Sequence, residues 1–289
     1  MEDQAQRLRE RLKRNHSNMQ TKSIAIISGK GGVGKSNMAL NFAISLNKKG
    51  HSVLLFDMDI GMGNIDILMG LSSSYSIADF FSESVPLKEL ICKVPDSIHY
   101  ISGGTGLTQL TQIKKSHFND FFNQFSTLLD DYEYVILDMG AGMDENSLSF
   151  ILSVDEVIVL TTPEPTSITD AYAAMKYIIL KNNQIPFYLL VNRATSEKEG
   201  QVVFNRISTV LEHFLDQKID LLGIVPEDKS IPQAVKRQTP FILFNNRAPA
   251  SKAIIKITET YCKQNHLKPE FDLTHKSFIS KLKRFLYER

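Results

Sequence analysis

The sequence predicts an α/β fold in which a doubly wound, mostly parallel sheet carries helices on both faces. Short apolar, β-branched segments alternate with segments of helical periodicity along most of the chain. A glycine-rich loop stands between the first such strand and the first such helix, and two later strands end in carboxylates. Open sheets of this type bind ligands at the carboxyl ends of their strands, so these residues predict a site at that edge.

The predicted strands are apolar segments rich in valine and isoleucine, which suits strands that are buried on both faces. They are Ser23–Ile27, Ser52–Phe56, Ile98–Ile101, Tyr134–Leu137, Glu156–Leu160, Phe187–Val191 and Leu221–Val225. The helices predicted to cover them are Lys35–Lys48, His117–Leu129, Ser167–Leu180, Glu199–Leu215 and Ala248–Asn265. We therefore expect three parts: an N-terminal arm over residues 1–21, a central α/β domain over residues 22–266 and a C-terminal tail over residues 267–289.

Composition limits the class of protein. The chain has 289 residues, 43% of them hydrophobic, which is enough for a substantial core. Its formal net charge of +1 gives no global basicity of the kind that nucleic-acid binding favours. Cys92 and Cys262 are far apart and form no C-x-x-C pair, which favours buried small side chains in a reducing cytosol. The absence of an apolar run of membrane-spanning length predicts a chain that is neither secreted nor integral to a membrane.

The most specific motif follows the first predicted strand directly: Gly29-Lys30-Gly31-Gly32-Val33-Gly34-Lys35-Ser36. It has the form of a P-loop, in which glycines let backbone N–H groups converge on phosphate oxygens at a helix N-terminus. A plain glycine turn would explain the glycines but not the Gly-Lys-Ser ending. Lys35 is predicted to reach the β- and γ-phosphates, and Ser36 to hold Mg²⁺. The residues expected to line the nucleotide here are Gly31, Gly32, Val33, Gly34, Lys35, Ser36 and Asn37.

Carboxylates follow two later strands. The second predicted strand runs into Asp57 and Asp59, and a carboxylate there could orient the water that attacks a γ-phosphate. The strand Tyr134–Leu137 leads to Asp138 and then to Gly140 and Gly142, which is the Walker-B pattern for an aspartate that meets Mg²⁺ through water. Without the P-loop, Asp57 and Asp59 would be interpreted as acidic residues that cap a turn. The Asp138 pattern is weak alone, because apolar strands that end in an aspartate are common.

Two further strand ends predict a base pocket. Asn192 offers a donor and an acceptor to a purine edge, and Arg193 can stack on its face. Pro226 and Asp228, at the end of the next strand, supply a second wall in this interpretation. Each pair is equally compatible with a polar turn at the end of a strand.

These residues together resemble the MinD/ParA class of deviant Walker-A ATPases, over about residues 22–265. The signs are Lys30 ahead of the paired glycines, the stretch Asp57-Met58-Asp59-Ile60-Gly61-Met62-Gly63-Asn64, Asp138 and Asn192-Arg193. The resemblance implies an ATP-hydrolysing, Mg²⁺-dependent enzyme that dimerises on ATP, with Lys30 of each subunit contacting the phosphates bound by the other. It makes Lys30, Lys35 and Asp59 catalytic. It assigns Mg²⁺ to Ser36, Asp57 and Asp138, and adenine reading to Asn192.

The N-terminal arm carries a second resemblance. Its first nine residues, MEDQAQRLR, look like the DQAxxLR motif of the FlhG group (also called YlxH or FleN), which regulates flagellar placement and number. In that group the motif is an activator helix for the GTPase FlhF. Ala5, Leu8 and Leu12 fall on one helical stripe, as a docking helix requires, although a solvated, frayed terminus would also fit the charge. The expected partner-binding residues are Gln4, Gln6 and Leu8.

The tail predicts a basic amphipathic helix. Its apolar positions at helical spacing are Phe278, Ile279, Leu282, Phe285 and Leu286. Such a helix can lie in the interface of an anionic bilayer, and it resembles the membrane-targeting helix of MinD-type proteins. We therefore expect a cytoplasmic protein that is peripheral to the inner face of the cell membrane. A terminal helix packed on the protein's own core is the alternative, and the two states can alternate with the nucleotide.

The function predicted is an ATP-dependent dimerising switch that controls flagellar number and placement. It would bind membrane in the ATP state, activate FlhF through its arm, and meet components of the flagellar basal body. A MinD-like division-site ATPase would share the core and tail but not the arm. A ParA-like partitioning ATPase needs a basic surface, so the near-zero net charge argues against DNA. An iron–sulfur carrier needs clustered cysteines, whereas a nucleotide-gated scaffold that barely turns over stays open.

Overall fold

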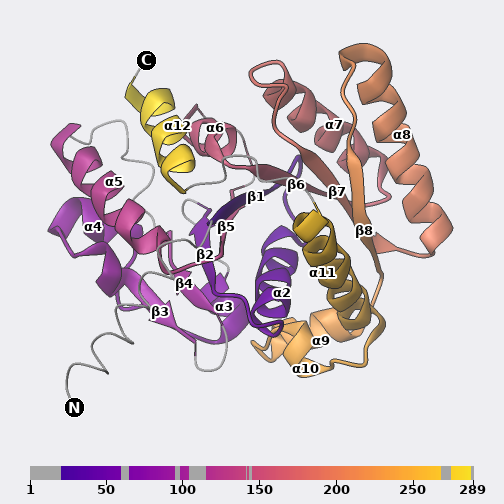
Figure 1. Cartoon of the computed structure of the whole chain (residues 1–289). Coiled ribbons are helices and arrows are strands. Elements are labelled where there is room, and N and C mark those ends of the chain that lie inside the picture. Colours follow the sequence, from indigo (N-terminus) through magenta and orange to yellow (C-terminus); the bar gives the residue numbers. More distant parts are fainter. Residues whose placement is uncertain are drawn as a thin grey trace.

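The computed structural model describes residues 21–59, 65–94, 98–103, 115–140, 142, 145–267 and 275–287. In this part of the chain, eight strands form one sheet in the order β3-β4-β2-β5-β1-β6-β7-β8, with helices on both faces (Figure 1). Neighbouring strands are parallel except for the antiparallel pair of β3 and β4. The predicted fold class is confirmed.

Each predicted strand is present near its expected position. They are β1 (Lys22–Ser28), β2 (Val53–Met58), β4 (His99–Ile101), β5 (Tyr134–Met139), β6 (Glu156–Thr161), β7 (Phe187–Ala194) and β8 (Asp220–Pro226). The strand β3 (Ile91–Lys93) was not predicted, because three residues are too few to show a strand period.

The predicted helices are also present, with others between them. The predicted ones are α2 (Lys35–Asn47), α5 (Lys115–Leu129), α7 (Pro165–Ile179), α8 (Glu197–Leu215), α11 (Pro249–Leu267) and the tail helix α12 (His275–Tyr287). The additional ones are α3 (Ile65–Met69), α4 (Ile77–Glu83), η1 (Leu87–Leu90), α6 (Glu145–Ser153), α9 (Ser230–Lys236) and α10 (Phe241–Phe244). Most of these extra helices are too short for a helical period to stand out from the sequence.

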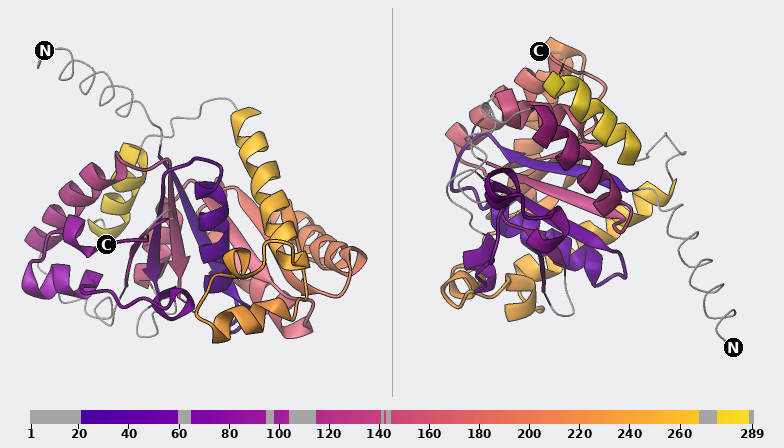
Figure 2. Two further views of the ribbon diagram at one scale, coloured as in Figure 1. Left: turned by 90° about the horizontal axis from the view of Figure 1, so that it is seen from below. Right: turned by 90° about the vertical axis from the view of Figure 1, so that its left-hand side faces the viewer.

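Alternate side chains of the central strand β1 enter two different cores. Ile24 and Ile26 join the cluster formed with α2, α10 and α11. Ala25 and Ile27 join the cluster on the other face, with residues of α4 to α8 and α12. Figure 2 shows the strands between these two layers of helices. Burial on both faces explains why the strands read as continuous apolar runs.

The tail helix α12 is docked on the second of these cores, beside α5 and α6 (Figure 1). Phe278, Ile279 and Leu282 are 1%, 5% and 0% exposed, and Phe285 packs against the same cluster. The apolar face that was predicted to contact a bilayer is thus covered by the protein itself. Burial against either surface removes the same apolar area from water, so the amphipathic pattern alone does not choose between them.

One ring contact and one ion pair fasten α12. The ring of Phe278 lies 6.1 Å from that of Phe125 of α5, edge to face. Lys281 Nζ lies 4.0 Å from Asp155 Oδ1, and the other oxygen of Asp155 accepts hydrogen bonds from the backbone and side chain of Ser23 at 2.9 and 2.6 Å. Of the remaining residues named for the two ends, the side chain of Leu286 and the arm residues Gln4, Gln6 and Leu8 lie outside the described part.

Candidate nucleotide site

The P-loop connects β1 to α2 at the carboxyl edge of the sheet, and two of its glycines are required by geometry. Gly34 has a φ of 93°, and a Cβ there would lie 2.8 Å from the amide nitrogen of Asn192. A Cβ on Gly29 would lie 2.1 Å from the backbone of Asp170 in α7. Any side chain at either position would therefore move the loop away from the groups that hold it.

The P-loop lysine is paired with the Walker-B aspartate. Lys35 Nζ lies 2.5 Å from Asp138 Oδ1, and the two side chains are 6% and 0% exposed. The Ser36 hydroxyl also favours the ionised Asp138 carboxylate and acts to lower its pKa. Burial raises the pKa of Asp138, while the charge of Lys35 opposes that rise. The pairing of Lys35 with Asp138 could not be predicted from two motifs 103 residues apart.

A second carboxylate lies beside this pair. Asp57 is fully buried and stands opposite Asp138, because β2 and β5 pair in that register. Its Oδ1 accepts a hydrogen bond from the backbone N–H of Asp59 at 2.9 Å. Burial, and then the charge of Asp138, raise the pKa of Asp57 to about 7. Oδ2 of Asp57 and Oδ2 of Asp138 are buried without a hydrogen-bond partner.

These two orphaned oxygens fit a hard divalent cation. Mg²⁺ in nucleotide sites is held by one or two carboxylates, with phosphate oxygens and waters completing its shell. Asp57, Asp138 and the Ser36 hydroxyl supply oxygen donors of that kind. Among the described residues no three His, Cys, Asp or Glu side chains gather into a closed cage, so the other ligands would come from phosphate and water.

Asp59 occupies a different environment from Asp57. It is only partly buried, directly after β2. It lies against the loop that follows β5, since a Cβ on Gly140 would come within 3.3 Å of Asp59 Oδ1. Of the two aspartates, Asp59 is therefore the one open to water at the mouth of the site, whereas Asp57 faces the buried charges.

Lys30 lies on the exposed rim of the P-loop and is held by the start of α7. Its Nζ is 3.4 Å from Glu164 Oε2 and 3.1 Å from Thr166 Oγ1, and its side chain is 42% exposed. Sequence reasoning missed both partners. The only local signal is Pro165, which marks the first turn of a helix but says nothing of a lysine contact.

Asn192 and Arg193, at the end of β7, fasten the P-loop backbone. The Asn192 side-chain amide donates to the carbonyl of Val33 at 2.8 Å, and its oxygen accepts from the N–H of Arg193 at 2.9 Å. The Arg193 guanidinium donates to the carbonyl of Gly32 at 3.0 Å. The structure thus gives both residues a loop-holding contact that the sequence did not indicate.

Asp228, just after β8, also holds neighbouring backbone in place. Asp228 accepts hydrogen bonds from the backbone N–H groups of Ser230 and Ala250, at 2.8 and 3.0 Å. Burial alone would raise the pKa of Asp228, but these amides outweigh it and lower that pKa. Both carboxylate oxygens of Asp228 are thus bonded at the starts of α9 and α11. Of the two residues predicted to line the base pocket here, Pro226 is therefore the better placed to contact a base.

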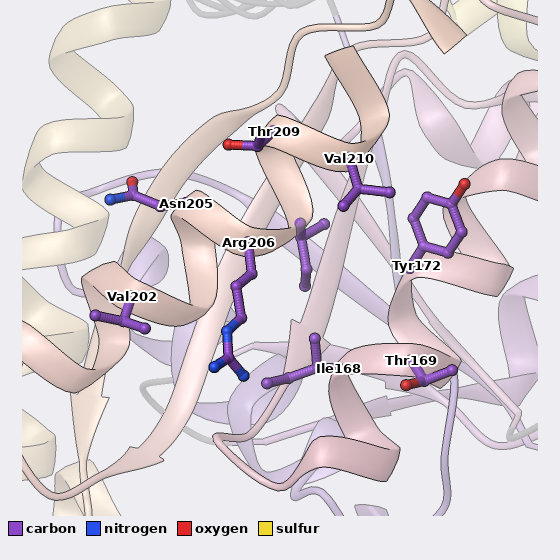
Figure 3. Close-up of a pocket in the computed structure, with 9 residues that line it drawn as sticks. Ile168, Thr169, Tyr172, Val202, Asn205, Arg206, Thr209 and Val210 are labelled. Carbon is purple, nitrogen blue, oxygen red and sulfur yellow. The ribbon is translucent and has the colours of Figure 1, made fainter. Parts of the chain in front are cut away.

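A large apolar groove of about 680 Å³ lies away from these charges, between α7 and α8. Figure 3 shows Arg206 of α8 extending toward Ile168 of α7, with Tyr172, Val202 and Val210 around them. Arg206 is the single charged side chain of this lining, which does not suit a metal-bound triphosphate. The hollow beside the P-loop, of about 480 Å³, is lined instead by Ser28, Gly29, Gly142 and Asp170, among others.

Comparison with known proteins decides the family. The ParA family model, described as NUBPL iron-transfer P-loop NTPase, matches residues 19–262. The chain is an ATPase of the ParA/MinD family. The antiactivator FleN of Pseudomonas aeruginosa is 32% identical over 80% of this chain and 82% of its own. The flagellum site-determining protein YlxH of Helicobacter pylori is 34% identical over 75% of this chain and 74% of its own. The predicted FlhG/FleN-type resemblance and the predicted ATPase activity are confirmed.

Solved structures share the fold of this ParA/MinD-family ATPase. The MinC:MinD cell division complex of Aquifex aeolicus matches with a TM-score of 0.69 and 24% identity, over 87% of this chain and 99% of that one. MinD of Pyrococcus horikoshii, solved with Mg-ADP, matches with a TM-score of 0.68 and 22% identity, over 87% of this chain and 100% of that one. In the described part of the chain, no helix is long and apolar enough to cross a membrane.

Proposed function

We propose that this ATPase is an ATP-switched homodimer that sets flagellar number and placement. The flagellar part is supported by the similarity to FleN and YlxH over three quarters or more of the chain. The observation that carries the switch is the position of Lys30, which is exposed on the rim and reaches α7 through Glu164 and Thr166. A cation placed there is available to phosphates bound by a second copy of the chain.

The charges of the site support a role for each residue within one subunit. Lys35 would exchange Asp138 for the β- and γ-phosphates of ATP, and Asp138, Asp57 and Ser36 are the residues that would then hold Mg²⁺. Bound Mg²⁺ would neutralise charge on the phosphate oxygens. Asp59, open to water, positions the attacking water molecule. Asn192 and Arg193, at the end of β7, and Pro226, at the end of β8, would contact the adenine.

Size-exclusion chromatography with ADP and with a non-hydrolysable ATP analogue tests the dimer. The wild type should dimerise only with the ATP analogue. Lys35→Ala should lose nucleotide binding, because it removes the positive charge that contacts the β- and γ-phosphates. Lys30→Ala should keep much of its ADP affinity and fail to dimerise, while Lys198→Ala, at an exposed position on α8, should behave as wild type. Normal dimers of both P-loop variants would contradict the model.

Rates of ATP hydrolysis distinguish the roles of Asp59 and Asp138. Asp59→Ala should bind ATP, accumulate as the dimer and hydrolyse roughly a hundredfold more slowly, the usual scale of a general-base contribution. Asp138→Ala should instead weaken the dependence on Mg²⁺. Unchanged turnover in the Asp59 variant would transfer the water-positioning role to Asp57.

We further propose that residues 1–21 form a partner-binding arm, residues 22–266 the ATPase domain and residues 267–289 a membrane-directed tail. A peptide of residues 1–21 should stimulate GTP hydrolysis by FlhF without the ATPase domain. Gln4→Ala and Leu8→Ala should reduce that stimulation, since Gln4 and Gln6 would reach the partner's active site and Leu8 an apolar groove. Lys35→Ala in the full chain should leave it unchanged.

An arm without effect on FlhF, as peptide and as full chain, would favour a MinD-like role. The septum site-determining protein MinD of Bacillus subtilis is 28% identical over 91% of this chain.

Membrane binding fits both the flagellar and the MinD-like role. It requires α12 to leave the core, because Phe278, Ile279 and Leu282 are buried there. Burial of each such side chain is worth about 1.5–3 kcal/mol, so release needs a comparable gain from the bilayer.

A further inference from the structure

A pocket of about 390 Å³ lies at the edge of the sheet opposite the nucleotide site. It opens where β2 and β4 begin and where α2, α5 and the antiparallel β3 end. The mechanism uses none of its residues. Its floor is apolar, from Val53 and Leu128, and its walls are polar, from His99, Ser52, Lys88 and Lys93. Cavities of this size with a few convergent polar groups are typical of small-molecule sites.

The hydrogen bond between His99 and Tyr132 fixes a donor in this wall. Tyr132 Oη lies 2.6 Å from His99 Nδ1. Burial raises the pKa of Tyr132 and lowers the pKa of His99, so the phenol keeps its proton and the imidazole is neutral. Tyr132 therefore donates to Nδ1, and the single ring proton of His99 stands on Nε2. His99 contributes an N–H donor to the pocket.

Ser52 adds a second donor. Its Oγ accepts a hydrogen bond from the backbone N–H of Glu133 at 2.9 Å, so its own hydroxyl proton remains to be donated. Lys88 and Lys93 supply two positive charges, and that of Lys93 is felt at the His99 ring, whose pKa it helps to lower. The pocket also contains the carboxylate of Asp131. The balance of these three charged groups is one net positive charge.

We propose that this pocket binds a small organic anion of the carboxylate or phosphate class. Lys88, Lys93 and the donors of His99 and Ser52 hold its anionic group. Val53 and Leu128 contact a short apolar body, and Asp131 accepts a hydrogen bond from a hydroxyl or amine of the ligand. The site is separate from the P-loop, because the whole length of α2, 13 residues, lies between Lys35 and the pocket residue Asn47.

Methyl NMR of the full chain, saturated with Mg-ADP so that the P-loop is filled, tests the proposal. Inorganic phosphate and succinate are titrated separately against KCl of equal ionic strength. Saturable shifts of the Val53 and Leu128 methyl groups with either anion are expected, and the anion that gives them decides the class. Lys88→Gln with Lys93→Gln should weaken that binding by at least tenfold.

Both lysines are exposed, so this double variant should fold normally. The matched control is Lys198→Gln with Lys263→Gln, which removes two exposed lysines from other helices and should bind as wild type. Three outcomes overturn the proposal: no saturable shift with either anion, the same shifts with KCl alone, or equal binding by the pocket variant and the wild type.

Discussion

At the scale of single residues, the nucleotide site is a set of buried charges that do not balance. Lys35 supplies one positive charge to two buried carboxylates, Asp57 and Asp138, each with an oxygen that has no hydrogen-bond partner. An unpaired buried charge is costly, so the pKa of Asp57 rises until protonation relieves it. A divalent cation would satisfy the same oxygens without the proton.

The raised pKa of Asp57 makes the stability of the free protein depend on pH. Its pKa is about 7 in the folded chain and 3.8 in the reference state, so between these values the folded state holds a proton that the unfolded state has lost. The free energy of unfolding should therefore fall as pH rises from about 4 to about 7, and Asp57→Asn should flatten this slope.

Urea denaturation at a series of pH values, without metal or nucleotide, measures this effect. Asp220→Asn, at an exposed position, is the control and should keep the wild-type slope. Saturating Mg-ADP should reduce the slope, because the cation favours the ionised carboxylate. An identical slope in the Asp57 variant would assign the pH dependence to other groups.

Glu164 should restrain the ATP-dependent dimer, since it occupies the lysine that the dimer requires. Glu164→Gln removes its charge from Lys30, and an exposed ion pair of this kind is worth up to about 1 kcal/mol. The dimer should then form at up to about fivefold lower protein concentration with the ATP analogue. Analytical ultracentrifugation measures this shift, with Glu197→Gln as the exposed control. A dimer that becomes weaker would mean that Glu164 contributes to the interface instead.

Site residues could be predicted from the sequence where they belong to one short local motif. The P-loop and the strand-end aspartates Asp57 and Asp138 could be named because their spacing is local. The contacts of Lys30 with Glu164 and of Asn192 with Val33 span 134 and 159 residues, and no local pattern encodes them. Such contacts depend on how strands order themselves in the sheet, which the periodicity of single segments leaves open.

At the scale of elements, long strands and helices were predictable because hydrophobic period and length agree. The short β3 and α10 carry too few residues for a period. The tail helix shows a different limit. Its amphipathic pattern was clear, yet the pattern describes one face and not the surface that covers it, and the structure covers it with α5 and α6.

Docking of α12 predicts a measurable loss of stability when its central side chain is truncated. Leu282→Ala leaves a cavity in the core and should lower the free energy of unfolding by about 2–5 kcal/mol. Urea denaturation of the full chain measures it. Ser280→Ala, on the exposed side of the same helix, should stay within about 0.5 kcal/mol of wild type. Equal stability of the two variants would show that α12 is undocked in solution.

At the scale of the whole molecule, the two helical layers carry different functional elements. The layer containing α2 begins at the P-loop, and the opposite layer holds both α7, which contacts Lys30, and the docked α12. The contacts of α7 with α6, and of α6 with α12, are continuous packing through one core. A change at Lys30 on forming the dimer therefore has a physical path by which it can alter the docking of α12.

The last prediction separates docking of the tail from its attraction to lipid. Arg284 is exposed on α12, so reversing its charge in Arg284→Glu should preserve the fold. It should weaken sedimentation with anionic vesicles at least about fivefold in the presence of the ATP analogue, because each basic residue near such a surface contributes about 1 kcal/mol. Deletion of residues 275–289 should abolish sedimentation, and ATP hydrolysis should persist in both variants.

Salt gives the matching control for this experiment. Binding of the wild type should weaken between about 0.05 and 0.5 M KCl, as the attraction to lipid headgroups is screened. Vesicles of neutral lipid should retain little protein at any salt concentration. If the deletion variant sediments with anionic vesicles as well as the full chain does, the contact lies elsewhere on the molecule, and α12 is a structural helix whose apolar face serves the core alone.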